Sequence, residues 1–174
     1  AVQEAGGAER VHPADRWPHE WSWRDLPSDA REQPLVPDGT THDLLEAQML
    51  PLMRASDARP VAARISDIAA GLGEGATQPQ VATLWRLAAA AFEAQANGLL
   101  GFDVFSKRVA SRLLAQFRAL ERGSADVSER LAQDLLFFCA QSAPPADPSS
   151  TPRLTAVRQA YGLTATQPVD YSRS

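Results

Sequence analysis

The chain has 174 residues, 44% of them hydrophobic and 22% charged, so it is long enough for one globular domain with a sizeable core. Its formal net charge of −4 argues against a nucleic-acid partner, which usually needs a basic face. No apolar run approaches the roughly 20 residues that a membrane-spanning helix needs, so we expect no membrane insertion. The single cysteine, Cys139, excludes an internal disulfide and is compatible with a reducing, cytoplasmic compartment.

The first 40 residues are rich in proline and contain three of the four tryptophans. Proline removes a backbone donor, so a long helix is excluded here, and we predict an extended N-terminal arm over residues 1–40. Two roles for this arm stay open: a latch on the bundle, which we favour, or an exposed hot spot for a protein partner. The residues concerned are Trp17, Trp21, Trp23 and Arg24.

Residues 41–163 carry the apolar spacing of helices, and no stretch has the character of a strand. We therefore predict an all-α fold, an antiparallel bundle of five or six helices that follows the arm. The first helix should begin near Thr41 with a threonine hydroxyl as its cap. Pro51 should kink this helix or end it early. Residues 164–174 should link the domain to the rest of a longer protein.

The middle of the chain is expected to be the scaffold of the bundle. A helix from Asp57 should end at Gly71 and Gly73, and the next should start at a capping box over residues 77–80. The stretch Gln80–Leu120 then predicts two long helices with a short connection, which should lie side by side and antiparallel.

Two further helices complete the predicted bundle. The second helix of the Gln80–Leu120 stretch should be followed by Gly123, a natural residue for the position after a helix. Asp126 and Glu129 open the next helix, whose apolar residues surround it nearly completely, so it should be covered on several sides. A proline-rich linker over residues 143–148 leads to a short last helix that Thr151 should cap.

Side chains with metal-binding or nucleophilic chemistry are sparse. None of His12, His19 and His42 has a partner at the spacing of a helical zinc site, so we expect no metal and no cofactor. Cys139 lies on an apolar helix, where an inert buried thiol is the expected state. The glycines at 71–75 follow a helix instead of a strand, unlike those of a phosphate-binding loop. No catalytic residue can be named.

His42 is the one candidate phosphoacceptor, because helical bundles can carry a phosphate on an exposed histidine. That chemistry needs a histidine in mid-helix, with a nearby lysine and a glycine that leaves space for the incoming domain. His42 instead stands at a helix start, and Asp43 and Glu46 would repel a phosphoryl group. We interpret His42 as part of a capping region and not as a phosphoacceptor.

Four stretches carry a family resemblance: Thr41–Met53, Leu84–Phe92, Ser128–Phe138 and Leu154–Leu163. They resemble the N-terminal region of ChpA-type hybrid histidine kinases, and the related scaffold protein FimL has a similar second domain. The resemblance implies a module akin to histidine phosphotransfer domains, in the chemosensory system that controls type IV pili and twitching motility. No His-x-x-Lys-Gly motif is present, so it implies a degenerate bundle without a phosphoacceptor.

We therefore predict a non-catalytic scaffold or protein-interaction domain, not an enzyme, within a hybrid sensor histidine kinase. The partners that the resemblance implies are a response regulator or a polar scaffold protein, together with neighbouring domains of the parent chain. We expect partner contacts on the solvent face of the Gln80–Leu120 stretch, at Lys107, Arg108 and Arg112.

The alternative is a ligand-sensing or dimerising helical domain with an apolar pocket. Aromatic side chains would line that pocket: Trp85, Phe92, Phe105, Phe137 and Phe138. A packed core is the commoner fate of such residues, whereas a sizeable apolar cavity with a few polar groups would favour this alternative.

Overall fold

The described part of the chain is built from α-helices alone, which confirms the all-α prediction. The computed structural model describes residues 23–24, 26–27, 33–54, 56–101, 104–124, 126–143 and 150–162, without the side chains of 104–106. The six helices are α2 (Gly39–Arg54), α3 (Arg59–Gly75), α4 (Pro79–Ala96), α5 (Val104–Glu121), α6 (Glu129–Gln141) and α7 (Pro152–Ala160). None of them is long and apolar enough to cross a membrane.

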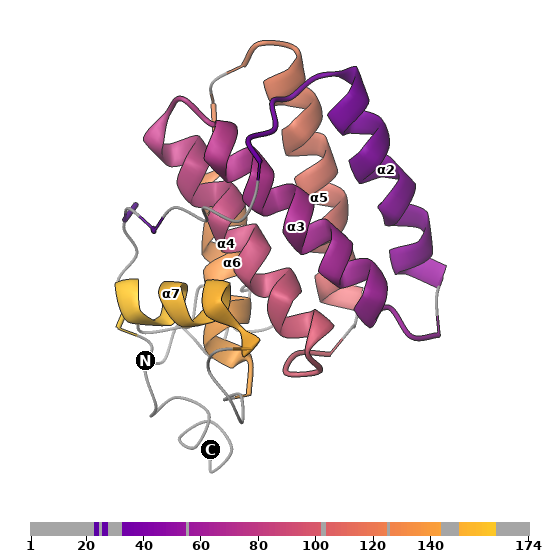
Figure 1. Cartoon of the computed structure of the whole chain (residues 1–174), viewed down its shortest axis with the longest axis vertical. Helices are drawn as coiled ribbons and strands as arrows, with labels where there is room; N and C mark the ends of the chain where they lie inside the picture. The colour runs from indigo at the N-terminus through magenta and orange to yellow at the C-terminus, as the bar shows by residue number, and fades with distance from the viewer. Residues whose placement is uncertain are drawn as a thin grey trace, which may run out of the picture.

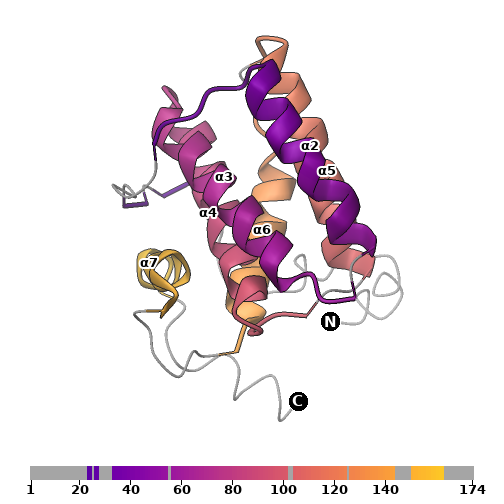
Figure 2. The ribbon, with the colours of Figure 1, turned by 45° about the vertical axis from the view of Figure 1, so that its right-hand side comes forward.

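The helices pack in pairs around α4 (Figures 1 and 2). α3 and α4 form the most extensive pair, α2 lies along α5, α6 packs against both α4 and α5, and α7 lies across α4 and α6. The prediction that α4 and α5 form the central hairpin was therefore wrong. α4 and α5 contact each other through large side chains: the ring of Trp85 on α4 lies edge-on to that of Phe117 on α5, with ring centroids 6.3 Å apart.

Small residues explain why α3 is the partner of α4. Ala88–Ala91 on α4 and Ala62, Ala69 and Ala70 on α3 are all buried, so the two backbones can approach closely. The hydroxyl of Ser66 on α3 donates a hydrogen bond to the Ala89 carbonyl of α4 at 2.7 Å. The larger side chains of α4, among them Leu84, Trp85 and Leu87, are buried in the core.

α2 differs from its prediction in its cap, and of the two outcomes predicted at Pro51 the early end is wrong. Its cap is Asp38, whose carboxylate accepts the Thr41 N–H at 2.9 Å, so no threonine hydroxyl is needed. The helix does not stop at Pro51 but continues to Arg54. Pro51 and Ala47 are both exposed, so water can satisfy the Ala47 carbonyl to which proline cannot donate.

α3 passes through Gly71 and Gly73 and ends at Gly75, so the predicted early end was wrong. The segment around Leu35 crosses the helix here, and the Leu35 N–H donates to the Gly71 carbonyl at 2.8 Å. A Cβ at Gly71 would lie 2.8 Å from Leu35 Cδ1 and 2.9 Å from the Gln33 carbonyl oxygen. One at Gly75 would overlap the Leu35 carbonyl oxygen. These glycines permit a close crossing and do not mark a helix end.

The remaining helix ends follow turn chemistry, with two corrections. The predicted capping box is absent, because Pro79 takes the first helical position and leaves the preceding residue as a cap without a side-chain bond. Likewise, the Thr151 side chain makes no capping bond at α7. Gly123 follows α5 as predicted, with a φ of 97°, and Ser128 caps α6 by accepting the Leu131 N–H at 3.1 Å.

Candidate functional site

The described residues of the N-terminal arm are bound to the bundle. Trp17 and Trp21 lie outside the described residues, whereas Trp23 is partly buried and packs on the core. The Arg24 N–H donates to the Tyr161 hydroxyl at 3.1 Å, and its guanidinium lies 5.3 Å from the centre of the Tyr161 ring. The same guanidinium donates to the Ala160 carbonyl at 2.9 Å. This part of the arm is therefore fastened to the C-terminal end of α7.

Side chains of α4 fix the arm from its other side. The Thr83 hydroxyl donates to the Arg24 carbonyl at 2.9 Å, and Arg86 donates to the carbonyl of the buried Leu26 at 3.3 Å. Arg86 is itself held by an ion pair with Glu74 at 2.9 Å. The arm thus bridges α4 and α7 in the way that the latch interpretation describes for Trp23 and Arg24.

α7 is docked by polar contacts with three other helices, and we name this region the α7 junction. The buried carboxylate of Glu93 on α4 accepts the Leu154 N–H at 2.9 Å, so it caps α7 from a neighbouring helix. Arg153 of α7 donates to Ser66 of α3 at 2.8 Å, and Arg158 donates to the Ser142 hydroxyl after α6 at 2.9 Å. The polar groups at the α7 junction therefore hold α7 against the neighbouring helices of the same chain.

The only cysteine lies beneath this junction and has no nucleophilic character. Cys139 is fully buried, and burial raises the pKa of its thiol to about 12. The thiol is therefore protonated at neutral pH, as expected for an inert core cysteine. Burial likewise raises the pKa of Tyr161 and lowers that of Arg158.

His42 lies in the first turns of α2 in surroundings that disfavour phosphate. Its ring is half-buried against Phe117 at a centroid distance of 5.9 Å, and its Nδ1 lies 3.4 Å from the Asp43 carboxylate. Ligand atoms of His42, Asp43 and Glu46 lie within 4.8 Å of one another, as a metal site requires. Glu46, however, is already paired with Arg118 at 3.2 Å. An incoming phosphoryl group would meet two carboxylates.

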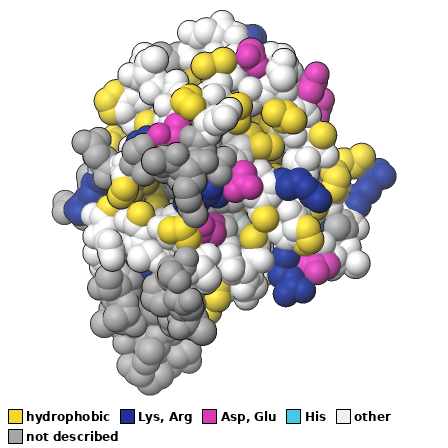
Figure 3. Space-filling model, viewed as in Figure 1, with side chains coloured by type: hydrophobic (Ala, Val, Ile, Leu, Met, Phe, Trp, Pro, Cys, Tyr) yellow, Lys and Arg dark blue, Asp and Glu magenta, His cyan; other side chains and the backbone are white. Residues whose placement is uncertain are grey.

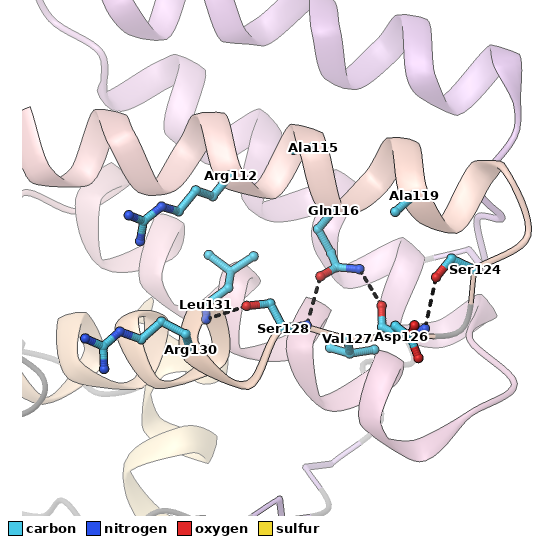
Figure 4. Close-up of a pocket in the computed structure, with 10 residues that line it drawn as sticks. All are labelled: Arg112, Ala115, Gln116, Ala119, Ser124, Asp126, Val127, Ser128, Arg130 and Leu131. Carbon is cyan, nitrogen blue, oxygen red and sulfur yellow. Dashed lines mark hydrogen bonds between the residues drawn. The ribbon is translucent and has the colours of Figure 1, made fainter.

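A groove of about 620 Å³ lies between α5 and the start of α6, and we name it the α5–α6 groove (Figure 4). It is held in shape by Gln116, which is almost fully buried. The Gln116 side chain donates to the Asp126 carbonyl at 2.9 Å and accepts the Ser128 N–H at 3.0 Å. One amide thereby ties the loop that precedes α6 to α5.

The two ends of the α5–α6 groove differ in charge. Arg112 of α5 and Arg130 of α6 are exposed, and Figure 4 shows both guanidinium groups at the same end. Arg112 pairs with the fully buried Asp134 at 3.1 Å, yet 45% of its side chain is exposed. Asp126 lies at the opposite end, and the lining between is largely apolar.

The predicted contact residues of α5 are only partly brought together. Arg112 lines the α5–α6 groove, whereas Lys107 and Arg108 are solvent-accessible one turn earlier on the same helix and do not line it. Sequence reasoning missed Arg130 and Gln116. A basic residue in the first turn of a helix, where acids are preferred, was a signal for Arg130.

The aromatic residues of the alternative, ligand-sensing hypothesis do not line this groove. Trp85 and Phe92 are buried in the common core, Phe137 and Phe138 pack on each other at 6.4 Å, and the Phe105 side chain lies outside the described residues. Large hydrophobic side chains are exposed at Val36, Leu44 and Leu50, and on the face in Figure 3 hydrophobic and charged side chains are interspersed.

A family of known proteins matches the helical bundle. The sequence profile of a family described as "FimL scaffold protein second domain" matches residues 30–174, which is more than half of the chain and includes all six described helices. No curated protein and no solved structure matches the chain. The match agrees with the FimL-like part of the resemblance.

Proposed function

The chain belongs to the family of FimL scaffold protein second domains, and from this we propose that it is a non-catalytic domain that binds signalling proteins. The proposed setting is the cytoplasmic chemosensory system that controls type IV pili and twitching motility. Its proposed partners are a response regulator or a polar scaffold protein, together with neighbouring domains of the parent chain. The observation that carries the proposal is the family match across the helical bundle.

The surroundings of the candidate phosphoacceptor support a role without phosphotransfer. His42 packs on Phe117, and the Asp43 carboxylate lies beside its Nδ1. A phosphorylated imidazole would place added negative charge next to that carboxylate and near Glu46, which disfavours the product. The proposed role is therefore that of a bundle whose surfaces bind proteins without phosphotransfer.

Incubation with a phosphorylated receiver domain, and separately with acetyl phosphate, tests the proposal. An active histidine phosphotransfer domain is the positive control, and His42→Ala is the matched negative control. We expect no acid-labile phosphate on this chain under conditions in which the control domain is labelled. A phosphate on the His42 imidazole, lost in His42→Ala, would overturn the proposal.

The finer part of the proposal is that the parent protein is a ChpA-type hybrid histidine kinase. The full reading frame tests this part: a kinase core downstream of the domain is the expected result. A parent without a kinase core would contradict it and would place the domain in a FimL-like scaffold protein. Co-purification with each response regulator encoded beside the parent gene then identifies the partner.

A further inference from the structure

We propose that the α5–α6 groove is the docking site for a short acidic segment of a protein partner. Carboxylates of that segment would bind Arg112 and Arg130, and an aliphatic side chain would lie on the apolar floor. The inference rests on the proposed scaffold function and names the chemistry of the partner that this surface would accept.

The groove is formed before any partner arrives. Gln116 bonds to two backbone groups of the loop just before α6, and Ser124 accepts the Asp126 N–H at 3.2 Å. At the end of α5, the Gly123 N–H donates to the Leu120 carbonyl at 3.0 Å, which closes the helix turn. A surface held by its own hydrogen bonds loses little entropy when it binds, so more of the contact energy appears as affinity.

The cationic end gives the preference for acids. A guanidinium has five N–H donors in a planar fork, and Arg112 bonds to Asp134 through one terminal nitrogen. With 45% of the Arg112 side chain exposed, further donors face solvent beside Arg130 on the next helix. Two guanidinium groups at one end of a groove fit paired carboxylates, because such pairs form charge-assisted and often bidentate bonds.

The floor of the groove selects a protein segment over a bare anion. Ala115 and Ala119 of α5 face Val127 and Leu131 across it, so an aliphatic side chain finds apolar contacts. Alanines one turn apart also let a backbone approach closely. Asp126 at the far end repels acids, so the acidic end of the bound segment would lie beside the arginines.

A phage-displayed library of random dodecapeptides, panned against the whole 174-residue chain, supplies the probe. We expect enriched peptides to place two or more acids beside an aliphatic residue. A labelled synthetic copy of the best peptide is then titrated by fluorescence anisotropy. Its affinity should fall as salt is added, since exposed ion pairs are screened.

Charge reversal at the groove is the decisive variant. Arg130→Glu should lower the affinity for the peptide by at least about tenfold, which corresponds to about 1.4 kcal/mol of binding free energy. Arg122→Glu is the matched control, because Arg122 is an exposed arginine that follows the last residue of α5 and does not line the groove, so this variant should retain binding. Arg112 is avoided, since its loss would leave the buried Asp134 without its ion pair.

A second pair of variants tests the floor. Ala115→Arg should block the peptide by filling the groove, whereas Ala63→Arg, on the exposed face of α3, should retain binding. Enrichment of basic or neutral peptides, or of none, would overturn the docking site. An unchanged peptide affinity in Arg130→Glu would also overturn it. A dimer of the wild-type chain that is lost in Arg130→Glu would overturn it too, because the groove would then bind a second copy of the chain. A response regulator that binds Arg130→Glu as tightly as wild type would reject the groove and leave the scaffold function standing.

Discussion

The α7 junction and the α5–α6 groove both contain arginines and acids, but these residues have different roles in the two regions. At the α7 junction Arg153 and Arg158 bind groups of their own chain, and a buried carboxylate caps a helix. At the α5–α6 groove two arginines are exposed above a small apolar floor. Polar groups buried between helices stabilise the fold, whereas exposed guanidinium groups beside a preformed groove can also bind another protein, even where, as for Arg112 with Asp134, they pair within the chain. Substitutions at the α7 junction should therefore change stability, and substitutions at the groove should change binding.

Loss of the cap at the α7 junction should have the largest effect. Glu93→Ala removes the acceptor of the Leu154 N–H and leaves the start of α7 uncapped in a buried place. We expect the free energy of unfolding to fall by about 3 kcal/mol, measured by urea denaturation. Glu93→Gln keeps an acceptor oxygen and should cost about 1 kcal/mol. Equal losses in the two variants would contradict a capping role.

The crossing of Leu35 over α3 is, like the α7 junction, a contact that stabilises the fold. Gly75→Ala would drive a Cβ into the Leu35 carbonyl oxygen. This should cost about 2 kcal/mol, more than the ~1 kcal/mol that alanine gains over glycine in a helix. Gly39→Ala is the control, because a Cβ there meets nothing within 4 Å. Thermal unfolding of both variants measures the difference, and a Gly75→Ala protein as stable as Gly39→Ala would rule out the close crossing.

Alkaline pH should weaken the core beneath the α7 junction. The Cys139 thiol has its pKa raised from 9.0 to about 12 by burial, so the unfolded chain releases this proton first. Stability is thus fully present below about pH 9 and is lost by up to ~1.4 kcal/mol per pH unit as pH rises toward 12. The raised pKa of Tyr161 acts in the same direction. Denaturation at several pH values should show a shallower slope for Cys139→Ala, and an unchanged slope would refute this origin.

The groove variant should have the smallest effect on stability. Arg130→Glu changes an exposed side chain in the first turn of α6, where a negative charge suits the helix dipole. We expect the free energy of unfolding to stay within about 0.5 kcal/mol of wild type. A loss as large as that of Glu93→Ala would place Arg130 among the structural residues and erase the contrast between the two regions.

Local chemistry in the sequence predicted the helices but not their partners. Apolar spacing and the glycine at 123 located α5 and α6, because those signals act over a few residues. The pairing of α4 with α3 and the close crossing at Gly75 depend on what other segments place nearby. From the sequence alone, Gly71 was therefore predicted to end α3, whereas it permits the segment around Leu35 to cross the helix.

The candidate site was the less predictable part for the same reason. Arg112 was identified from its own helix, but Arg130 and Gln116 gain meaning only when α5 and α6 come together. The Glu93 carboxylate accepts the N–H of a residue 61 positions further along the chain, and no local pattern marks a helical acid as the cap of a distant helix. Contacts of this kind follow from the packing of the whole bundle and leave no local pattern.

The central claim is that the domain acts by binding a protein and not by accepting a phosphate. The most direct measurement is a two-dimensional NMR titration of the chain with the phosphorylated response regulator encoded beside its parent gene, following backbone amides and the His42 imidazole together. We expect shifts in residues 112–119 and 126–131, with the imidazole unphosphorylated. A phosphorus–nitrogen bond on His42, with the groove amides unmoved, would contradict it.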